Sequence, residues 1–128
     1  MEITHNESFP HKELTYEIIG CAFEVYKHLG YGYLEKVYQR ALQVELQLRG
    51  IETVIEHRIQ VNYKGVVVGD YSADLFVAGQ VMVELKVAPV YSKTDEAQLL
   101  NELVSTSSKV GLLINFGKEK VEFKRLAN

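Results

Sequence analysis

The sequence has little cysteine and proline, no secretion signal and no long hydrophobic run. One cysteine among 128 residues excludes a disulfide framework and a zinc site built from cysteines. No apolar run approaches the roughly 18 residues that a membrane-spanning helix needs. The first residues, MEITHNESFP, contain no hydrophobic signal region. We therefore expect neither secretion nor membrane insertion, and a location in the reducing cytoplasm.

The chain also has no large excess of positive or of negative charge. The chain has 14 basic and 17 acidic residues, which gives a net charge of -3. This balance argues against a protein that coats nucleic acid by bulk electrostatics. It is compatible with a local nucleic-acid site in which a bound metal neutralises clustered carboxylates.

The chain shows no internal boundary. Its only prolines are Pro10 and Pro89, and it contains no linker, repeat or low-complexity tract. With 47% hydrophobic and 24% charged residues, the composition is that of an ordinary globular protein. We predict one domain over residues 1–128, with residues 1–11 as a loose, polar N-terminal segment.

Hydrophobic periodicity predicts two helices in the first half of the chain. Residues 12–29 place apolar side chains at spacings of three and four, and Gly30 closes this helix. A second helix is predicted over residues 34–49, with Gly50 as its stop. The apolar stripe expected to face the core consists of Leu34, Val37, Ala41, Val44 and Leu48.

The period then changes to two, which is typical of half-buried strands. We predict a strand over residues 53–63, an extended stretch over 66–77 that is broken near Gly69-Asp70, and a strand over 81–87.

The last third of the chain alternates again between helix and strand. A helix is predicted to begin at Ser92 or Thr94 and to end near Ser108. Residues 110–116, VGLLINF, read as a strand covered on both faces, and residues 121–125 as a short, basic last strand. The helix residues expected to point inward are Ala97, Leu100, Leu103 and Val104.

This order of elements, α-α-β-β-β-α-β-β, indicates an α/β fold with a mixed sheet flanked by helices. A helix that connects the strand of Lys86 to residues 110–116 is a crossover connection. Crossovers join parallel strands, so this pair is expected to be parallel, beside an antiparallel meander.

The residues most able to carry chemistry are Asp74, Glu84 and Lys86. Glu84 and Lys86 are two apart in a strand, so their side chains point to one face. An odd-length turn centred on Gly79 places Asp74 opposite Glu84 in the antiparallel pair. Carboxylates so paired can share one hard cation, and an adjacent lysine can orient an attacking water or stabilise charge on a phosphoryl group.

A second interpretation of this pattern stays open. An E-x-K sequence on a strand is usually a solvated face with a weak ion pair, and D…ExK alone is a pattern of low specificity. The context favours a site, because Glu84 and Lys86 lie within the otherwise apolar strand VMVELKV, where exposure to solvent does not explain both.

Several segments resemble a known family. Residues 32–38 match the signature G-x-x-E-x-x-Y of the GxxExxY protein family, and four further segments resemble its other landmarks in the right order. The resemblance covers residues 12–125. The family is similar to the PD-(D/E)XK nuclease superfamily, whose α-β-β-β-α-β core is the restriction-endonuclease-like fold. The matching segments are GYLEKVY (32–38), YSADL (71–75), VELK (83–86), EAQLL (96–100) and LLINF (112–116).

The resemblance implies a role for individual residues. Asp74, Glu84 and Glu35 would be ligands of Mg²⁺ or Mn²⁺, Lys86 the catalytic lysine, and Gln98 a helix glutamine beside the site. All five are therefore expected to be catalytic. The residues expected to bind substrate are Tyr38, Lys36 and Lys93.

Two positions depart from the family pattern. Glu102 stands where an aromatic residue is more common, and Asp95 where a histidine is common. These departures bear on substrate contacts more than on metal binding.

The leading hypothesis is a metal-dependent nuclease-like domain that hydrolyses nucleic-acid phosphodiesters, with DNA expected ahead of RNA. A domain of this size is expected to need a homodimer or a protein partner to grip a duplex. Two alternatives remain. One is a non-catalytic interaction module that keeps the nuclease fold and binds protein through Tyr31, Tyr33 and Tyr38. The other is an intact metal site that acts on a different phosphate-containing ligand.

Overall fold

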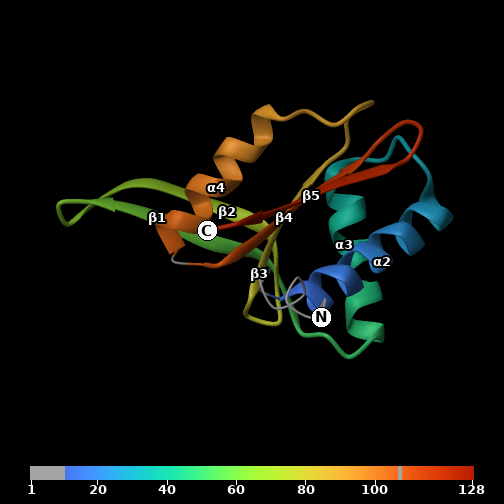
Figure 1. The fold of residues 1–128 in the computed structure, drawn as a ribbon, viewed down its shortest axis with the longest axis horizontal. Coiled ribbons are helices and arrows are strands. Elements are labelled where there is room, and N and C mark those ends of the chain that lie inside the picture. Colours follow the sequence, from blue (N-terminus) through green and yellow to red (C-terminus); the bar gives the residue numbers. More distant parts are fainter. Residues whose placement is uncertain (1–10, 107) are drawn as a thin grey trace, which may run out of the picture.

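The computed structural model describes residues 11–106 and 108–128. The elements follow the predicted order (Figure 1). They are the helices α2 (Lys12–Leu29), α3 (Glu35–Leu48) and α4 (Thr94–Thr106), and the strands β1 (Thr53–Tyr63), β2 (Val66–Val77), β3 (Val81–Lys86), β4 (Val110–Phe116) and β5 (Val121–Ala127).

The strands form one five-stranded sheet in the order β1-β2-β3-β4-β5. β3 and β4 run parallel, and every other neighbouring pair is antiparallel. The helix α4 is the crossover between the two parallel strands. The predicted α/β fold, with a mixed sheet flanked by helices and a meander beside a parallel pair, is therefore confirmed.

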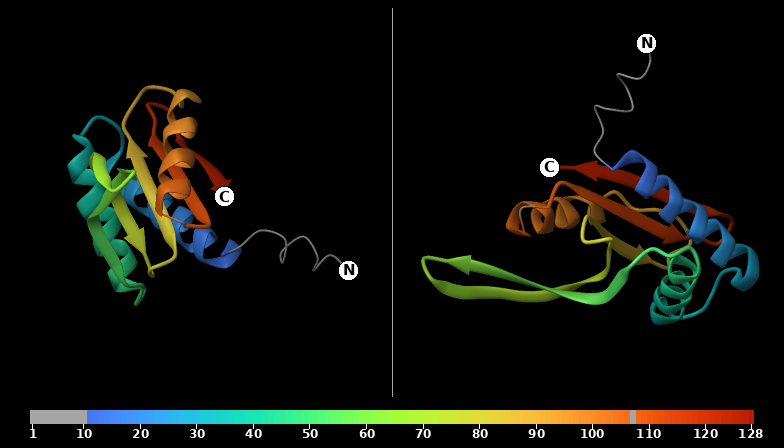
Figure 2. Two further views of the ribbon diagram at one scale, coloured as in Figure 1. Left: turned by 90° about the vertical axis from the view of Figure 1, so that its left-hand side faces the viewer. Right: turned by 90° about the horizontal axis from the view of Figure 1, so that it is seen from below.

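The helices cover the two faces of the sheet and create two cores. On one face, α2 and α3 pack through residues such as Ile18 and Leu42 against Leu85 and Ile114. On the other face, α4 lies against the sheet (Figure 2), where its main contacts are with β4, β1 and β5. Its contacts join Leu99 and Leu103 to Met82 and Leu113.

Alternation along β3 sorts its side chains between these two faces. Val83 and Leu85 enter the core under α2 and α3. Glu84 and Lys86 point the other way and line cavities together with α4 residues. All seven residues of β4 are buried, as predicted for a strand covered on both faces.

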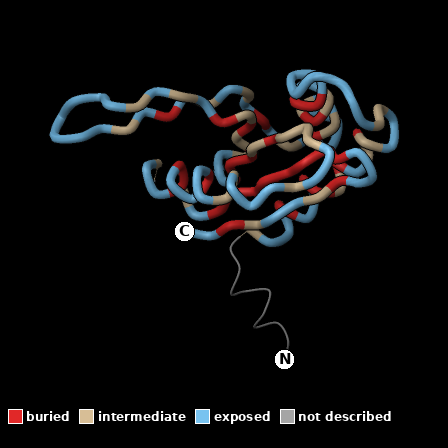
Figure 3. The backbone as a smooth tube through the Cα atoms, turned by 90° about the horizontal axis from the view of Figure 1, so that it is seen from above, coloured by how far each residue is buried: buried red, intermediate tan, exposed pale blue. Residues whose placement is uncertain are grey.

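The hairpin of β1 and β2 forms an arm that extends beyond the rest of the sheet (Figure 2). The predicted break in β2 near Gly69-Asp70 is wrong, because β2 is continuous from Val66 to Val77. The pairing register shifts instead: Val61 pairs with Gly69 and Asn62 with Val67, so that β2 carries one extra residue, Val68, next to Gly69. Most of the arm is exposed or half-buried (Figure 3).

The predicted inward stripe of α3 is wrong except at Ala41, which packs against the core. Leu34 and Leu48 are 80% and 77% exposed, and Val44 also faces solvent. The helix buries the neighbouring stripe, which contains Tyr38, Leu42 and Leu46 at spacings of four. Both stripes are apolar, and the buried one is the stripe whose tyrosine, Tyr38, packs against the core.

Of the four residues of α4 that periodicity assigns to the inward face, only Leu103 is buried. Ala97, Leu100 and Val104 are exposed, and the buried residues are Leu99, Glu102 and Leu103. Leu99 and Leu103 sit over Gly111 of β4, where an added Cβ would lie 3.1 Å from Leu99 and 3.2 Å from Leu103. The absence of a side chain at Gly111 therefore lets this face of the helix approach the sheet.

Other predictions concern the ends and the single cysteine. Residues 1–10 of the predicted loose segment lie outside the described residues, and His11 precedes α2, where its carbonyl accepts the N–H of Thr15. Cys21 is a free, buried thiol whose pKa is raised to about 11 by desolvation. Among the described residues, no helix is long and apolar enough to cross a membrane.

The assignment of the α3 faces is tested by a matched pair of leucine substitutions. Leu42→Ala should lower the free energy of unfolding by about 2–5 kcal/mol, because it opens a cavity in the core. Leu48→Ala, on the exposed stripe, should change it by less than about 0.5 kcal/mol. Urea unfolding of both variants measures the difference, and equal losses would contradict the assignment.

Candidate active site

The site begins at the point where β2 and β3 separate. Their ladder is paired through Leu75 and Val83, so Asp74 and Glu84 come next in register, as predicted. Instead of continuing the ladder, the main-chain N–H of Leu85 donates to Oδ2 of Asp74 over 2.7 Å. The Asp74 carboxylate therefore takes the place of a main-chain acceptor, and this bond fixes its position beside Glu84.

Gln39 of α3 supports Asp74 from the other side. Its Nε2 donates to the main-chain carbonyl of Asp74 over 2.9 Å, and the residue is only 3% exposed. Sequence reasoning missed Gln39. The available signal was its position one helical turn after Glu35, which places both residues on the same face of the helix.

The segment GYLEKVY at residues 32–38 sets the position of Glu35. Gly32 has a φ of 118°, a left-handed conformation that favours glycine. Tyr38 anchors the loop before α3, because its hydroxyl donates to the carbonyl of Gly30 over 2.5 Å. Its ring stacks on Phe116 of β4 with centroids 4.4 Å apart. Glu35 thus projects from the first turn of a helix whose start is tied to the core.

Tyr38 itself does not reach the cleft. It is completely buried, and its hydroxyl is bonded to the loop. The expectation that Tyr38 binds substrate is therefore corrected to a structural role, in which it positions Glu35.

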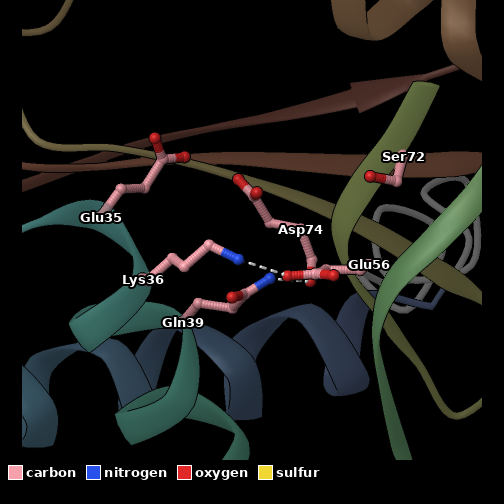
Figure 4. A pocket seen from close by; sticks show the side chains of 6 residues that line it. All are labelled: Glu35, Lys36, Gln39, Glu56, Ser72 and Asp74. Atoms are coloured by element: carbon pink, nitrogen blue, oxygen red, sulfur yellow. Dashed lines mark hydrogen bonds and ion pairs between the residues drawn. The ribbon is translucent and has the colours of Figure 1, made fainter.

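Glu35 reaches Asp74, which the sequence alone left open. The two side chains extend toward one another across the cleft (Figure 4). Burial, followed by hydrogen bonding with Asp74 and the negative charge of Asp74, raises the pKa of Glu35 to about 7.

Lys36 lies at the rim of this part of the site and Lys93 lies apart from it. Lys36 pairs with Glu56 over 2.8 Å, and both line a cavity of about 350 Å³ (Figure 4). The other lining residues are Glu35, Gln39, Ser72 and Asp74. Lys93 is exposed in the segment before α4 and lines none of the three cavities described at the site.

Lys86 connects the remaining two cavities. It lines one of about 200 Å³ together with Glu35 and Asn115, and a second of about 10 Å³ together with Glu84. Its Nζ lies 3.8 Å from Oδ1 of Asp95 in an ion pair. Asp95, noted above as a departure from the family pattern, thus holds the lysine at the mouth of the cleft.

Beneath α4, Glu84 contacts a carboxyl group that sequence reasoning had not placed in the site. Glu102 is 1% exposed, and after burial its carboxyl group is the next cause of the raised pKa of Glu84. Gln98, predicted to lie beside the site, donates from Nε2 to Oε2 of Glu102 over 3.3 Å. Gln98 therefore lies next to Glu102, although its side chain is largely exposed.

Negative charge dominates the whole cleft. The cations among the residues that line its three cavities are Lys36 and Lys86, and each is already paired with a carboxylate. Desolvation raises the pKa of Glu84 to about 10, with further contributions from Glu102 and Asp74. The clustered carboxyl groups of the cleft therefore favour the binding of protons or cations.

The donor set fits a hard divalent cation in its chemistry. Asp74, Glu84 and Glu35 supply only oxygen atoms, which Mg²⁺ and Mn²⁺ prefer. Oε2 of Glu84 is buried, and no hydrogen-bond donor among the described residues reaches it, so it has a free coordination position. Within the described part of the chain, however, no three such side chains are already arranged as a complete metal site.

Comparisons with known proteins agree with this fold. The family model described as "PD-(D/E)XK nuclease superfamily" matches residues 12–126. The crystal structure of SSO0001 superposes with a TM-score of 0.56 at 19% identity, over 73% of this chain and 50% of that one. This chain thus spans about half the length of that protein, and the likeness concerns the fold. No curated protein sequence matches significantly.

The structural role of Tyr38 leads to a stability prediction. Tyr38→Phe should lower the free energy of unfolding by about 1–3 kcal/mol, because it leaves the carbonyl of Gly30 without its donor. Tyr16→Phe, at an exposed position of α2, is the matched control and should have little effect. Equal urea midpoints for wild type and Tyr38→Phe would contradict the anchoring role.

The raised pKa of Glu84 predicts a pH dependence of stability in the metal-free protein. Glu84 is protonated in the folded chain up to about pH 10, whereas it ionises near its ordinary pKa of 4.5 once unfolded. Its stabilising contribution is thus complete below that ordinary pKa and is lost as the pH rises toward 10. In EDTA, the urea midpoint should fall between pH 5 and pH 9, and less steeply for Glu84→Gln. Parallel profiles for the two proteins would contradict the raised pKa.

Proposed function

Because this chain belongs to the PD-(D/E)XK nuclease superfamily, we propose that it is a divalent-metal-dependent nuclease that hydrolyses nucleic-acid phosphodiesters. The observation that carries the proposal is the convergence of Asp74, Glu84 and Lys86 at one end of the β2–β3 pair. Glu35 joins them from a separate helix. Four residues from three elements thus meet in one cleft.

Asp74, Glu84 and Glu35 would hold the metal ion, Mg²⁺ or Mn²⁺. A divalent cation in such a site lowers the pKa of a bound water and neutralises charge on the phosphate. The acidic cleft supports this assignment, because carboxylates buried beside one another are destabilising without a cation or protons.

Lys86 is the residue that we assign to the reacting phosphate. Its ammonium group lies on the same face of β3 as Glu84 and reaches the mouth of the cleft, where Asp95 holds it. There it would orient the attacking water or stabilise charge on the phosphoryl oxygens. Gln98 would assist from α4, through its hydrogen bond with Glu102.

The substrate would lie along the cavity between α3 and β2. Lys36 at its rim would contact a phosphate, and Lys93 would do so from the segment before α4. We propose DNA ahead of RNA as the substrate, and a homodimer or a protein partner that adds the surface needed to grip a duplex. The proposal extends to a GxxExxY-type protein that works in the reducing cytoplasm, where its one thiol stays free.

A second candidate is an interaction module that keeps the fold without catalysis. The observation in its favour is the exposed apolar stripe of α3, which includes Leu34, Val44 and Leu48. Tyr31 and Tyr33 are also exposed nearby, although Tyr38 is not available to a partner. Metal binding separates the two candidates, because the module has no need of it.

The nuclease proposal is tested by calorimetric titration with Mg²⁺ and Mn²⁺ and by cleavage of plasmid, single-stranded DNA and RNA. Asp74→Asn should abolish metal binding and lower cleavage by about 100-fold or more. Lys86→Met should lower cleavage to a similar extent while metal binding remains measurable, because the lysine is not a ligand.

Asp70→Asn is the matched control, since Asp70 lies on the same strand outside the cleft and pairs with Arg58. It should leave binding and cleavage unchanged. Metal binding without cleavage of any nucleic acid would favour a different phosphate-containing ligand. No binding at millimolar metal would favour the interaction module.

A further inference from the structure

The segment that connects β3 to α4, residues 87–93, is held in place by one buried side chain. Asn115 of β4 is 1% exposed. Its Oδ1 accepts the main-chain N–H of Ala88 over 2.9 Å, and its Nδ2 donates to the carbonyl of Ala88 over 3.0 Å. The ladder between β3 and β4 ends at Lys86 and Asn115. Beyond this point, one side-chain amide supplies the donor and the acceptor that a neighbouring strand would supply.

Glu122 of β5 supports the same segment from behind Asn115. Its Oε1 accepts from Nδ2 of Asn115 over 3.1 Å and from the main-chain N–H of Tyr91 over 2.8 Å. The carbonyl of Pro89 accepts a main-chain N–H from the turn between β4 and β5 over 3.1 Å. The connecting segment is therefore fixed to the sheet at three points.

The anchored end of this segment lies directly beside Lys86. Lys86, Asn115 and Glu122 are paired in register across β3, β4 and β5, so their side chains lie in a row on one face of the sheet. Lys86 and Asn115 line the same cavity of about 200 Å³. Both hydrogens of the Asn115 Nδ2 group are used within the protein. Asn115 therefore shapes this cavity and has no N–H left to donate to a substrate.

The other end of the segment positions the start of α4. The hydroxyl of Tyr91 donates to Oε2 of Glu96, in the first turn of that helix, over 2.6 Å. The residue before Glu96 is Asp95, whose carboxylate pairs with the ammonium group of Lys86 at 3.8 Å. The chain from Lys86 to Asp95 thus forms a loop that is closed by this ion pair and fixed to the sheet in between.

We propose that Asn115 is a positioning residue for the reaction assigned to Lys86. Supported by Glu122, it fixes the segment between β3 and α4 and so holds Lys86 and Asp95 at the mouth of the cleft. This inference rests on the proposed function, because the role of Lys86 is part of it. A displacement of about 1 Å in a catalytic site can lower a rate about 100-fold, so the position of this segment bears directly on catalysis.

Asn115→Leu tests the proposal, because it removes all three hydrogen bonds of the amide at a similar side-chain size. The kcat for cleavage of DNA should fall about 10- to 100-fold, and KM should change by less than about threefold. Mn²⁺ affinity, measured by calorimetry, should stay the same because Asn115 is not among the proposed ligands. Exchange of the Ala88 amide hydrogen, followed by NMR, should become at least about tenfold faster.

Glu122 offers a matched pair of variants. Both hydrogen bonds to Glu122 end on its Oε1, and the amide oxygen of a glutamine can accept them equally well. Glu122→Gln should therefore keep kcat within about twofold of wild type, whereas Glu122→Leu should behave like Asn115→Leu. Asn101→Leu, at an exposed position of α4, is the control and should change neither the kinetics nor the exchange.

Urea unfolding shows which variants are folded, and the Glu122 pair tests the proposal even if Asn115→Leu is not. An unchanged kcat in folded Asn115→Leu or Glu122→Leu overturns the positioning role and leaves the proposed nuclease intact. Loss of Mn²⁺ binding together with cleavage also overturns it, because the substitution then disturbs the whole cleft. Absence of cleavage by wild type overturns the proposed function and this inference with it.

Discussion

The hydrogen bond from the main chain of Leu85 to the side chain of Asp74 is the contact on which the site depends. At this point β2 leaves the ladder, and its next acceptor is a carboxylate instead of a carbonyl. The carbonyl of Asp74, released from the ladder, is taken up by Gln39 of α3. The separation of β2 from β3 therefore orients the side chain of Asp74 and opens a cleft beside it. It also frees the carbonyl that binds α3, the helix that carries Glu35.

Burial of several carboxyl groups in that cleft has an energetic cost that the rest of the fold must offset. Glu35 and Glu84 have raised pKa values because each loses water and lies near other negative charge. The two apolar cores on either side of the sheet supply the compensating stability. This arrangement is typical of binding sites, where local instability without the ligand is tolerated because the scaffold is rigid.

Much of this organisation could be predicted from the sequence, for reasons that differ between elements. The alternation from Val83 to Val87 and the turn at Gly79 were sufficient to pair Asp74 with Glu84 and to align Lys86, because strand geometry leaves few alternatives. The buried face of each helix was harder to predict. α3 has two apolar stripes, and only packing of Tyr38 on Phe116 distinguishes them. α4 buries a glutamate, which no pattern based on hydropathy assigns to an interior. The role of Tyr38 depends on contacts with Gly30 and Phe116, which only the tertiary structure shows, whereas the position of Gln39 one helical turn after Glu35 was a signal that the sequence offered.

The alternation along β3 has a consequence for how reliably the chain assembles. A slip of this strand by one residue would turn Glu84 and Lys86 into the core under α2 and α3, and would expose Val83 and Leu85 in the cleft. Such a mispaired form would lose its core and its site together. The register of β3 therefore determines both the core and the site, and a chain that packs its core correctly also has its site residues in the cleft.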